Sequence, residues 1–325
     1  MPIIQNDNKE LKPLVSFIIT YYNEPIDMLR ECIESILSLS LSASEREVIL
    51  IDDGSDICPI NDLVDIRDSI VYVRKKNEGL SIARNIGIKA CHGEYIQFVD
   101  ADDYLVRNAY EHCLDIVRYH NPDIVLFRST NKHETETPWV LPEPITGSEY
   151  MRHNNMRASA CGYVFRQKVL HELKFTPNIL HEDEDFTPQL LLRCERVFDT
   201  QCNAYFYRKR EDSITNKIDK RSVIKRLDDI ENVIFRLYDK LDTLSATDRA
   251  AMQRRINQLT MDYIYNVIRL TKSWHFLQQR IDRIYDKGLY PLPLNHYTKK
   301  YYWFARMSSS KAGLRILFAM ISITR

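Results

Sequence analysis

The first half of the chain alternates between continuous apolar runs and segments of helical periodicity. Apolar, β-branched runs predict strands at residues 14–20, 47–51, 70–73, 95–99 and 123–127. Apolar positions three and four apart predict helices at residues 25–39, 80–90 and 109–119. Because continuously apolar strands separated by helices are typical of a parallel sheet covered on both faces, we predict an α/β fold.

The second half is mixed and then helical. Short strands are expected at residues 161–166 and 204–208, and a helix at residues 186–194. From Lys220 onward, apolar positions recur with helical spacing. We therefore predict a catalytic or binding domain at residues 1–219 and a helical region at residues 220–325.

Polar side chains follow three of the predicted strands directly. They are Tyr22 and Glu24, then Asp52 and Asp53, then Asp100 and Asp102. In parallel sheets, ligands bind beyond the carboxyl ends of the strands. The sequence therefore predicts one polar site built from these three segments.

The third segment has the chemistry of a cation site. Side chains alternate along an extended chain, so Asp100 and Asp102 point to the same side. Two carboxylates at a strand end suit a hard divalent cation that holds a diphosphate. The alternative is a polar turn in which Asp103 is the N-cap of the next helix.

Composition narrows the function classes. The 45 basic and 45 acidic residues balance, so no overall field indicates nucleic acid as a partner. The 7 cysteines include no C-x-x-C pair, which favours buried thiols in a reducing compartment. No apolar run approaches the ~20 residues of a membrane span. We expect a cytoplasmic protein, with the inner face of the plasma membrane as the alternative location.

Four segments resemble family 2 glycosyltransferases of the GT-A fold. They are residues 15–24, 51–55, 78–87 and 93–103, and both their order and their spacing match. The resemblance covers roughly residues 13–215 and is weak beyond Lys220. It implies a Rossmann-like, mostly parallel sheet flanked by helices, with a C-terminal helical extension.

The resemblance also implies roles for the residues that bind the nucleotide. Thr20, Tyr22 and Glu24 match positions that hold the base and ribose, and an aromatic ring can stack on a base. Asp53 matches a residue that accepts from the N–H of uracil. Arg84 is expected to pair with Asp100 or with the diphosphate.

The remaining implied roles concern the metal and the chemistry. Asp100 would contact the ribose or donor sugar, and Asp102, with Asp100, would bind Mn²⁺ or Mg²⁺. In the acidic segment 182–185, Asp183 matches the catalytic base, with Glu182 as the next candidate. The alternative is that these acids only stabilise a helix N-terminus.

Arg208 and Arg210 lie in a segment that resembles the loop after the last core strand of the family. Their cations would close on the diphosphate of the donor, and a solvated charge run is the alternative. The Q-x-x-R-W signature of processive, polymer-extruding members is missing.

These expectations define an inverting, metal-dependent enzyme that transfers one sugar from a UDP-sugar. The acceptor would be a hydroxyl of a saccharide or of a lipid-linked saccharide in cell-surface polysaccharide synthesis. The alternatives are a sugar-nucleotide nucleotidyltransferase and a non-catalytic membrane-bound scaffold. The first would need a Gly-rich basic loop where residues 22–25 stand, and the second does not explain the intact carboxylates.

The last part of the chain has its own character. No Asp or Glu occurs from Gly288 to Arg325, whereas cations and aromatic residues are frequent. Leu314, Leu317, Phe318 and Ile321 form one helical stripe. The segment suits a helix in an anionic membrane interface, and a helix docked on the core or in an oligomer remains the alternative.

Overall fold

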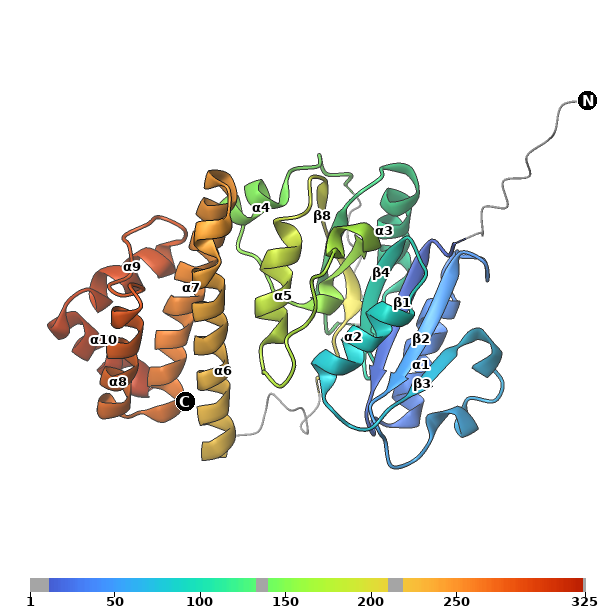
Figure 1. Cartoon of the computed structure of the whole chain (residues 1–325), viewed down its shortest axis with the longest axis horizontal. Coiled ribbons are helices and arrows are strands. Elements are labelled where there is room, and N and C mark those ends of the chain that lie inside the picture. The colour runs from blue at the N-terminus through green and yellow to red at the C-terminus, as the bar shows by residue number, and fades with distance from the viewer. Residues whose placement is uncertain (1–11, 133–139, 210–218, 324–325) are drawn as a thin grey trace, which may run out of the picture. The chain divides into compact units, whose positions relative to one another are not determined.

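The computed structural model describes residues 12–132, 140–209 and 219–323 (Figure 1). The chain forms two compact units. Unit 1 contains Met1–Pro144, Ala160–Lys174 and Arg196–Arg208, and unit 2 contains Ile145–Ser159, Phe175–Glu195 and Lys209–Arg325. These units are defined by packing. The functional division predicted between residues 219 and 220 stays a prediction.

An eight-stranded sheet forms the centre of unit 1. Its strands are β1 (Val15–Tyr21), β2 (Arg46–Asp52), β3 (Val71–Arg74), β4 (Tyr95–Asp100), β5 (Tyr104–Leu105), β6 (Ile124–Thr130), β7 (Tyr163–Arg166) and β8 (Val197–Phe206). Their order is β3-β2-β1-β4-β7-β6-β8-β5. The predicted α/β fold is confirmed.

Strand direction follows the prediction in one part of the sheet and departs from it in another. Neighbours among β3, β2, β1 and β4 are parallel, as are β6 and β8. Strand β7 runs antiparallel to both β4 and β6, and the short β5 runs antiparallel to β8. The sheet is therefore mixed, with parallel pairing along the half that carries the polar segments.

Three helices pack in unit 1: α1 (Ile26–Leu37), α2 (Leu80–Ala90) and α3 (Arg107–Tyr119). Helix α2 contacts β1 and β2, and α3 contacts β6 and β8. Gly87 allows α2 to approach the sheet, since a Cβ there would stand 2.2 Å from the Ile18 side chain. Strand β1 is buried along nearly its whole length, which explains its continuous apolar sequence.

Unit 2 is helical. Its helices are α4 (Gly147–His153), α5 (Glu182–Leu191), α6 (Lys220–Asp239), α7 (Ala246–Thr271), α8 (Trp274–Asp286), α9 (Lys299–Ser308) and α10 (Lys311–Ile323). Helix α7 is central, because it contacts α4, α6, α8, α9 and α10, and Figure 1 shows it alongside α6. Side chains cap five of these helices: those of Thr146, Asp219, Ser245, Ser273 and Thr298.

A buried charge cluster joins the helices of unit 2. Glu231 has no exposed surface and accepts from the Tyr263 hydroxyl at 2.7 Å. Arg280 and Arg283 pair with the same carboxylate at 3.2 Å and 2.5 Å. Removing one partner of such a pair leaves an uncompensated buried charge, so this cluster fixes how α6, α7 and α8 pack.

Several local predictions need correction. Strand β8, the last strand along the chain, begins at Val197 rather than at residue 204. The side chains of residues 199–204 alternate between covered and more exposed positions. Helix α5 begins at Glu182, because the four acids of its first turn favour the helix dipole. Asp103 is not a helix cap, since the N-cap of α3 is Val106.

Two further observations concern the helices. No helix of the described ranges is long and apolar enough to cross a membrane. The predicted stripe of α10 faces the protein, where Leu314, Leu317 and Ile321 are buried. Phe318 packs edge-on against Trp274, with ring centroids 5.4 Å apart.

Candidate functional site

The three polar segments meet at one edge of the sheet in unit 1. Strand β1 lies between β2 and β4, and all three are parallel. Thr20 is in register with Asp100 of β4, and Tyr21 is in register with Asp52 of β2. The carboxyl ends of these strands therefore bring the residues predicted to bind the nucleotide and the metal to the same edge.

The loops after β1 and β2 are tied to each other. Asn23, at φ 61°, donates its N–H to the Ser55 hydroxyl at 3.1 Å. Its side chain accepts from the Asp56 N–H at 2.8 Å and donates to the Asp56 carboxylate at 3.1 Å. Sequence reasoning assigned no role to these residues. An Asn between an aromatic residue and an acid after a strand was the only available signal, since Asn tolerates positive φ.

Tyr22 and Glu24 differ in what they contact. The Tyr22 side chain is 47% exposed, so its ring is accessible to a flat ligand. The Glu24 carboxylate accepts the Tyr22 N–H at 2.6 Å and thereby fixes the turn. Glu24 thus has a structural contact, and the predicted roles of Thr20, Tyr22 and Glu24 in base and ribose binding stay predictions.

The two acids after β2 have separate contacts. Asp52 is fully buried and accepts from the Ser55 N–H at 2.8 Å and the Tyr72 hydroxyl at 2.7 Å. Asp53 accepts from Lys75 and from the N–H groups of residues 78 and 79, at 3.0 Å and 2.8 Å. Since a carboxylate has about four acceptor positions, these three contacts leave about one unused, and the predicted role of Asp53 in uracil binding stays a prediction.

Gly54 allows this arrangement. Its φ is +80°, and a Cβ there would stand 2.6 Å from the backbone nitrogen of Asn77. Both the left-handed backbone and the close approach exclude a side chain. The segment that donates to Asp53 can therefore lie directly over the end of β2.

Arg84 of α2 reaches the end of β4. Its guanidinium is buried and donates to the Asp100 carboxylate at 3.2 Å. It also lies over the Phe98 ring, 5.8 Å from the centroid. The predicted Arg84–Asp100 pair is thus present, and it holds one of the two candidate metal ligands in place.

Tyr205 and Asp103 support the segment that contains Asp100 and Asp102. The Tyr205 hydroxyl accepts from the Asp100 N–H at 3.1 Å and donates to the Asp103 carboxylate at 2.8 Å. Burial, then the neighbouring charge of Asp100, raises the pKa of Asp103 to about 8. Sequence reasoning missed this pair, because no local pattern indicates a contact between residues 102 positions apart.

Arg208 is held against the same segment. Its N–H donates to Asp103 at 2.7 Å, and its Nε donates to the Asp102 carbonyl at 2.9 Å. Its guanidinium also pairs with Glu31 at 2.6 Å. Arg208 therefore places positive charge beside the candidate metal ligands. Arg210 lies outside the described residues.

The candidate catalytic acids belong to unit 2. Glu182 and Asp183 occupy the first turn of α5, and the next two acids anchor that turn. Glu184 pairs with Arg255. Asp185 accepts from the Thr176 hydroxyl at 2.6 Å. The Asp183 side chain is partly exposed on this fixed turn, and its role as the base stays a prediction.

The donor set fits a divalent cation that is shared with a ligand. Within residues 12–132, 140–209 and 219–323, no three His, Cys, Asp or Glu side chains gather to hold a metal. Mg²⁺ sites commonly use one or two carboxylates plus substrate phosphates. Asp100 and Asp102 would hold such an ion through their carboxylate oxygens, and this role stays a prediction.

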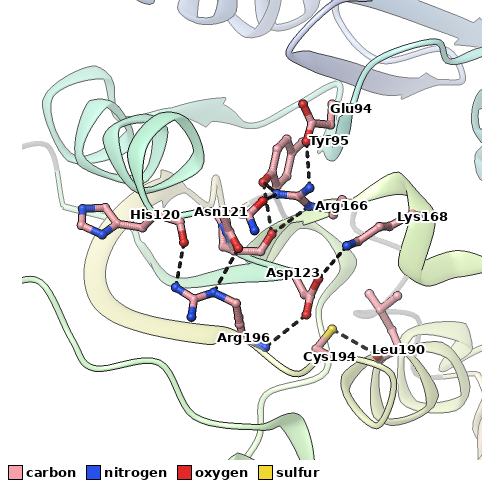
Figure 2. Close-up of polar contacts among 11 residues, drawn as sticks. Glu94, Tyr95, His120, Asn121, Asp123, Arg166, Lys168, Leu190, Cys194 and Arg196 are labelled. Atoms are coloured by element: carbon pink, nitrogen blue, oxygen red, sulfur yellow. Dashed lines mark hydrogen bonds and ion pairs between the residues drawn. The ribbon is translucent and has the colours of Figure 1, made fainter.

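A second polar cluster of unit 1 lies at the opposite ends of the strands (Figure 2). Arg166 pairs with Glu94 at 2.9 Å and lies 4.9 Å from the Tyr95 ring centroid. Asp123 accepts from the Arg196 N–H at 3.1 Å. These contacts join the starts of β4, β6 and β8. They are structural, since ligands of such sheets bind at the carboxyl edge.

Comparison with known proteins agrees with this geometry. Residues 16–174 match the model of Glycosyl transferase family 2. The glycosyltransferase EpsJ of Bacillus subtilis is 32% identical over 225 residues, which cover 62% of this chain and 63% of EpsJ. The match thus spans less than two thirds of that relative.

Solved structures share the fold. S. aureus TarS 1–349 is 17% identical, with a TM-score of 0.61 over 91% of this chain and 90% of TarS. Its complex with UDP-GlcNAc has a TM-score of 0.54 over 85% of this chain and 92% of that one, also at 17% identity. The mannosyltransferase PcManGT of Pyrobaculum calidifontis, in complex with GDP-Man and Mn²⁺, is 13% identical, with a TM-score of 0.56 over 96% and 87% of the two chains.

The sheet and these neighbours define a GT-A α/β fold. Its parallel half presents carboxylates and an aromatic side chain at the carboxyl edge. Residues 16–174 of this chain belong to glycosyltransferase family 2.

Proposed function

We propose that this protein is an inverting, metal-dependent glycosyltransferase that moves one sugar from a UDP-sugar to an acceptor hydroxyl. The observation that carries the proposal is the register of β2, β1 and β4. It brings Tyr22, Asp53, Asp100 and Asp102 to one edge of the sheet. An aromatic ring can stack on a nucleotide base, a carboxylate can accept from its N–H, and a carboxylate pair can share a cation with its diphosphate, so the side chains at this edge support the proposal.

The proposed chemistry is a single displacement. Asp183 takes the proton from the acceptor hydroxyl as its oxygen bonds to the anomeric carbon. The bond from that carbon to the diphosphate oxygen breaks, and UDP departs with the electron pair. A divalent cation, when bound by Asp102 and Asp100, supplies positive charge for the departing diphosphate.

The other residues hold this arrangement. Arg84 fixes Asp100 through the pair at 3.2 Å. Arg208 binds the carbonyl of Asp102 and adds charge near the diphosphate. The acid-rich turn of α5, with Glu182 as the alternative base, is anchored by Arg255. Positioning of this kind supplies a large part of the rate in bimolecular transfers.

The acceptor we propose is a saccharide or a lipid-linked saccharide in cell-surface polysaccharide synthesis. UDP is proposed as the carrier because Asp53 keeps about one acceptor position and because the neighbour TarS is solved with UDP-GlcNAc. A guanine edge also carries N–H donors, and the neighbour PcManGT is solved with GDP-Man. The binding test must therefore compare UDP with GDP.

The test is thermal stabilisation by UDP or GDP, with and without Mn²⁺. Binding at 100 times Kd stabilises the folded state by about 2.7 kcal/mol. We expect a Mn²⁺-dependent shift with UDP that Asp102→Ala loses. Asp68→Ala, at a carboxylate that is 97% exposed elsewhere in unit 1, is the matched control and should keep the shift.

The catalytic role is tested separately. Asp183→Asn should retain the UDP shift and lose sugar transfer, because the amide cannot accept the proton. Retained transfer would remove Asp183 from the role and direct attention to Glu182. If the folded wild-type protein shows no thermal shift with either nucleotide, the result would contradict the proposed glycosyltransferase activity. It would support the alternative of a non-catalytic scaffold.

A further inference from the structure

Helix α10 carries two apolar stripes, and only one is buried in unit 2. Leu314, Leu317 and Ile321 are covered, where α10 contacts α7 and α9. Ile316, Met320 and Ile323 are 54%, 60% and 81% exposed. Their spacing of four and three residues places them on one face of the helix. A helix that only docks on a core does not need this second stripe.

One cation of α10 borders the exposed stripe. Lys311 and Arg315, one turn apart on α10, are both exposed. At 100° per residue, Arg315 lies about 80° from Ile323 and about 100° from Ile316, at the edge of the exposed face. Lys311 lies about 180° from Met320, on the far side of the helix. The Arg315 guanidinium also lies 5.8 Å from the Trp274 ring centroid, which keeps it at the surface of α8 and α10.

Helix α9 adds a tryptophan between cations. Lys299, Trp303 and Arg306 are exposed and share one face of α9, at positions i, i+4 and i+7. The Trp303 side chain is 61% exposed. Tryptophan is enriched where one end of a side chain meets hydrocarbon and the other meets water. Since α9 packs against α10, the two helices form one structural piece.

The positive charge of α9 and α10 distinguishes between two possible binding partners of this surface, a second copy of the chain and a lipid bilayer. No acidic residue occurs from Gly288 to Arg325, so a second copy placed symmetrically on the surface would bring cations against cations. An anionic bilayer has the complementary charge, and its headgroup region accepts apolar side chains. Helix α10, at 13 residues, is shorter than the ~20 residues that a membrane span needs, which suits a helix that lies in the bilayer surface.

We propose that α9 and α10 bind the surface of an anionic lipid bilayer. Ile316, Met320 and Ile323 enter the boundary between headgroups and acyl chains. Arg315, with Lys299 and Arg306 of α9, contacts lipid phosphates. This surface is independent of the proposed sugar transfer, so either proposal can fail alone.

The test is sedimentation of the full chain with vesicles of phosphatidylcholine alone or with phosphatidylglycerol added. We expect binding to the anionic vesicles, weakened by salt. Replacing Ile316, Met320 and Ile323 together by Ser should lower the affinity more than tenfold. Arg315→Gln should lower it about fivefold, the factor expected for one cation near such a surface. Lys311→Gln, on the far side of α10, should lower it less.

A matched control removes equal apolar exposure elsewhere. Ile57, Val64 and Tyr119 of unit 1 are 73%, 56% and 75% exposed, and replacing all three by Ser should leave vesicle binding unchanged. Binding that is equal for the two triple variants would overturn the proposal, as would wild-type protein that ignores anionic vesicles. Wild-type self-association that the α10 variant abolishes, without vesicle binding, would assign the surface to a second copy instead.

Tryptophan fluorescence gives a measurement that needs no α10 variant. Anionic vesicles should shift the emission of the wild type to the blue, as Trp303 leaves water. Trp303→Phe should lose that shift. An unchanged shift in Trp303→Phe would contradict the proposed orientation of α9.

Discussion

Tyr205→Phe removes one hydroxyl that links the two ends of the candidate metal segment. The hydroxyl accepts from the Asp100 N–H at 3.1 Å and donates to Asp103 at 2.8 Å. A hydrogen bond between neutral groups contributes about 1 kcal/mol, and one to a charged group about 1.5–3 kcal/mol. Above about pH 8, where the Asp103 carboxylate is charged, we therefore expect the free energy of unfolding to fall by about 2.5–4 kcal/mol.

Loss of stability alone would not establish a role at the site, so a matched tyrosine is needed. Tyr95, at the other end of β4, is also buried, and its hydroxyl donates to the Pro122 carbonyl at 3.1 Å and accepts from Arg166. Tyr95→Phe thus removes one neutral and one charged contact, as Tyr205→Phe does. Urea unfolding should show losses in the same range for both variants.

Nucleotide binding should separate the two variants. Loss of a residue that orients metal ligands typically lowers metal affinity 10–100-fold. Titration calorimetry with UDP and Mn²⁺, at a temperature where both variants are folded, should show such a loss for Tyr205→Phe only. Equal affinity for Tyr205→Phe and wild type, or an equal loss in Tyr95→Phe, would refute the reasoning.

Two further predictions concern the backbone and pH. Gly54→Ala and Gly79→Ala both place a side chain at positive φ, at a cost of about 1–3 kcal/mol. Only the new side chain of Gly54→Ala would also meet the Asn77 backbone. Urea unfolding should therefore show a larger loss of stability for Gly54→Ala, and equal losses would contradict the close approach at Gly54. Burial, then the charge of Arg226, lowers the pKa of His181 in the folded protein. As the pH falls below about 6.5, the imidazole is therefore protonated in the unfolded chain before it is protonated in the folded one, and the folded state loses stability. His181→Asn, which suits the left-handed backbone at φ 67°, should flatten the dependence of the melting temperature on pH in that range, and an unchanged slope would exclude His181.

The sequence predicted what local patterns record. The apolar runs of β1, β2 and β4 are continuous because both faces of the sheet are covered, and the polar segments stand where those runs stop. The Arg84–Asp100 pair also followed, because the helix and the strand end were both recognisable. The fold and the edge that carries the candidate site were therefore accessible from sequence.

Other features depend on contacts between distant residues. The antiparallel direction of β7 is a matter of pairing, which a short apolar run does not record. In the sequence, nothing distinguishes Tyr205 from other strand residues. Its hydroxyl meets Asp103 only when the sheet is folded. Likewise, helical spacing identified the apolar residues of α10, whereas its exposed stripe follows from how α10 packs in unit 2.

The discontinuous path of unit 2 has a consequence for synthesis on the ribosome. Arg255 pairs with Glu184 on the turn that carries the candidate base, yet it is translated 71 residues later. At about 5–20 residues per second, that turn waits roughly 4–14 s for this counter-ion. A nascent chain that already contains every residue of the sheet would therefore still lack this ion pair, and a gene shortened after residue 219 would never supply it.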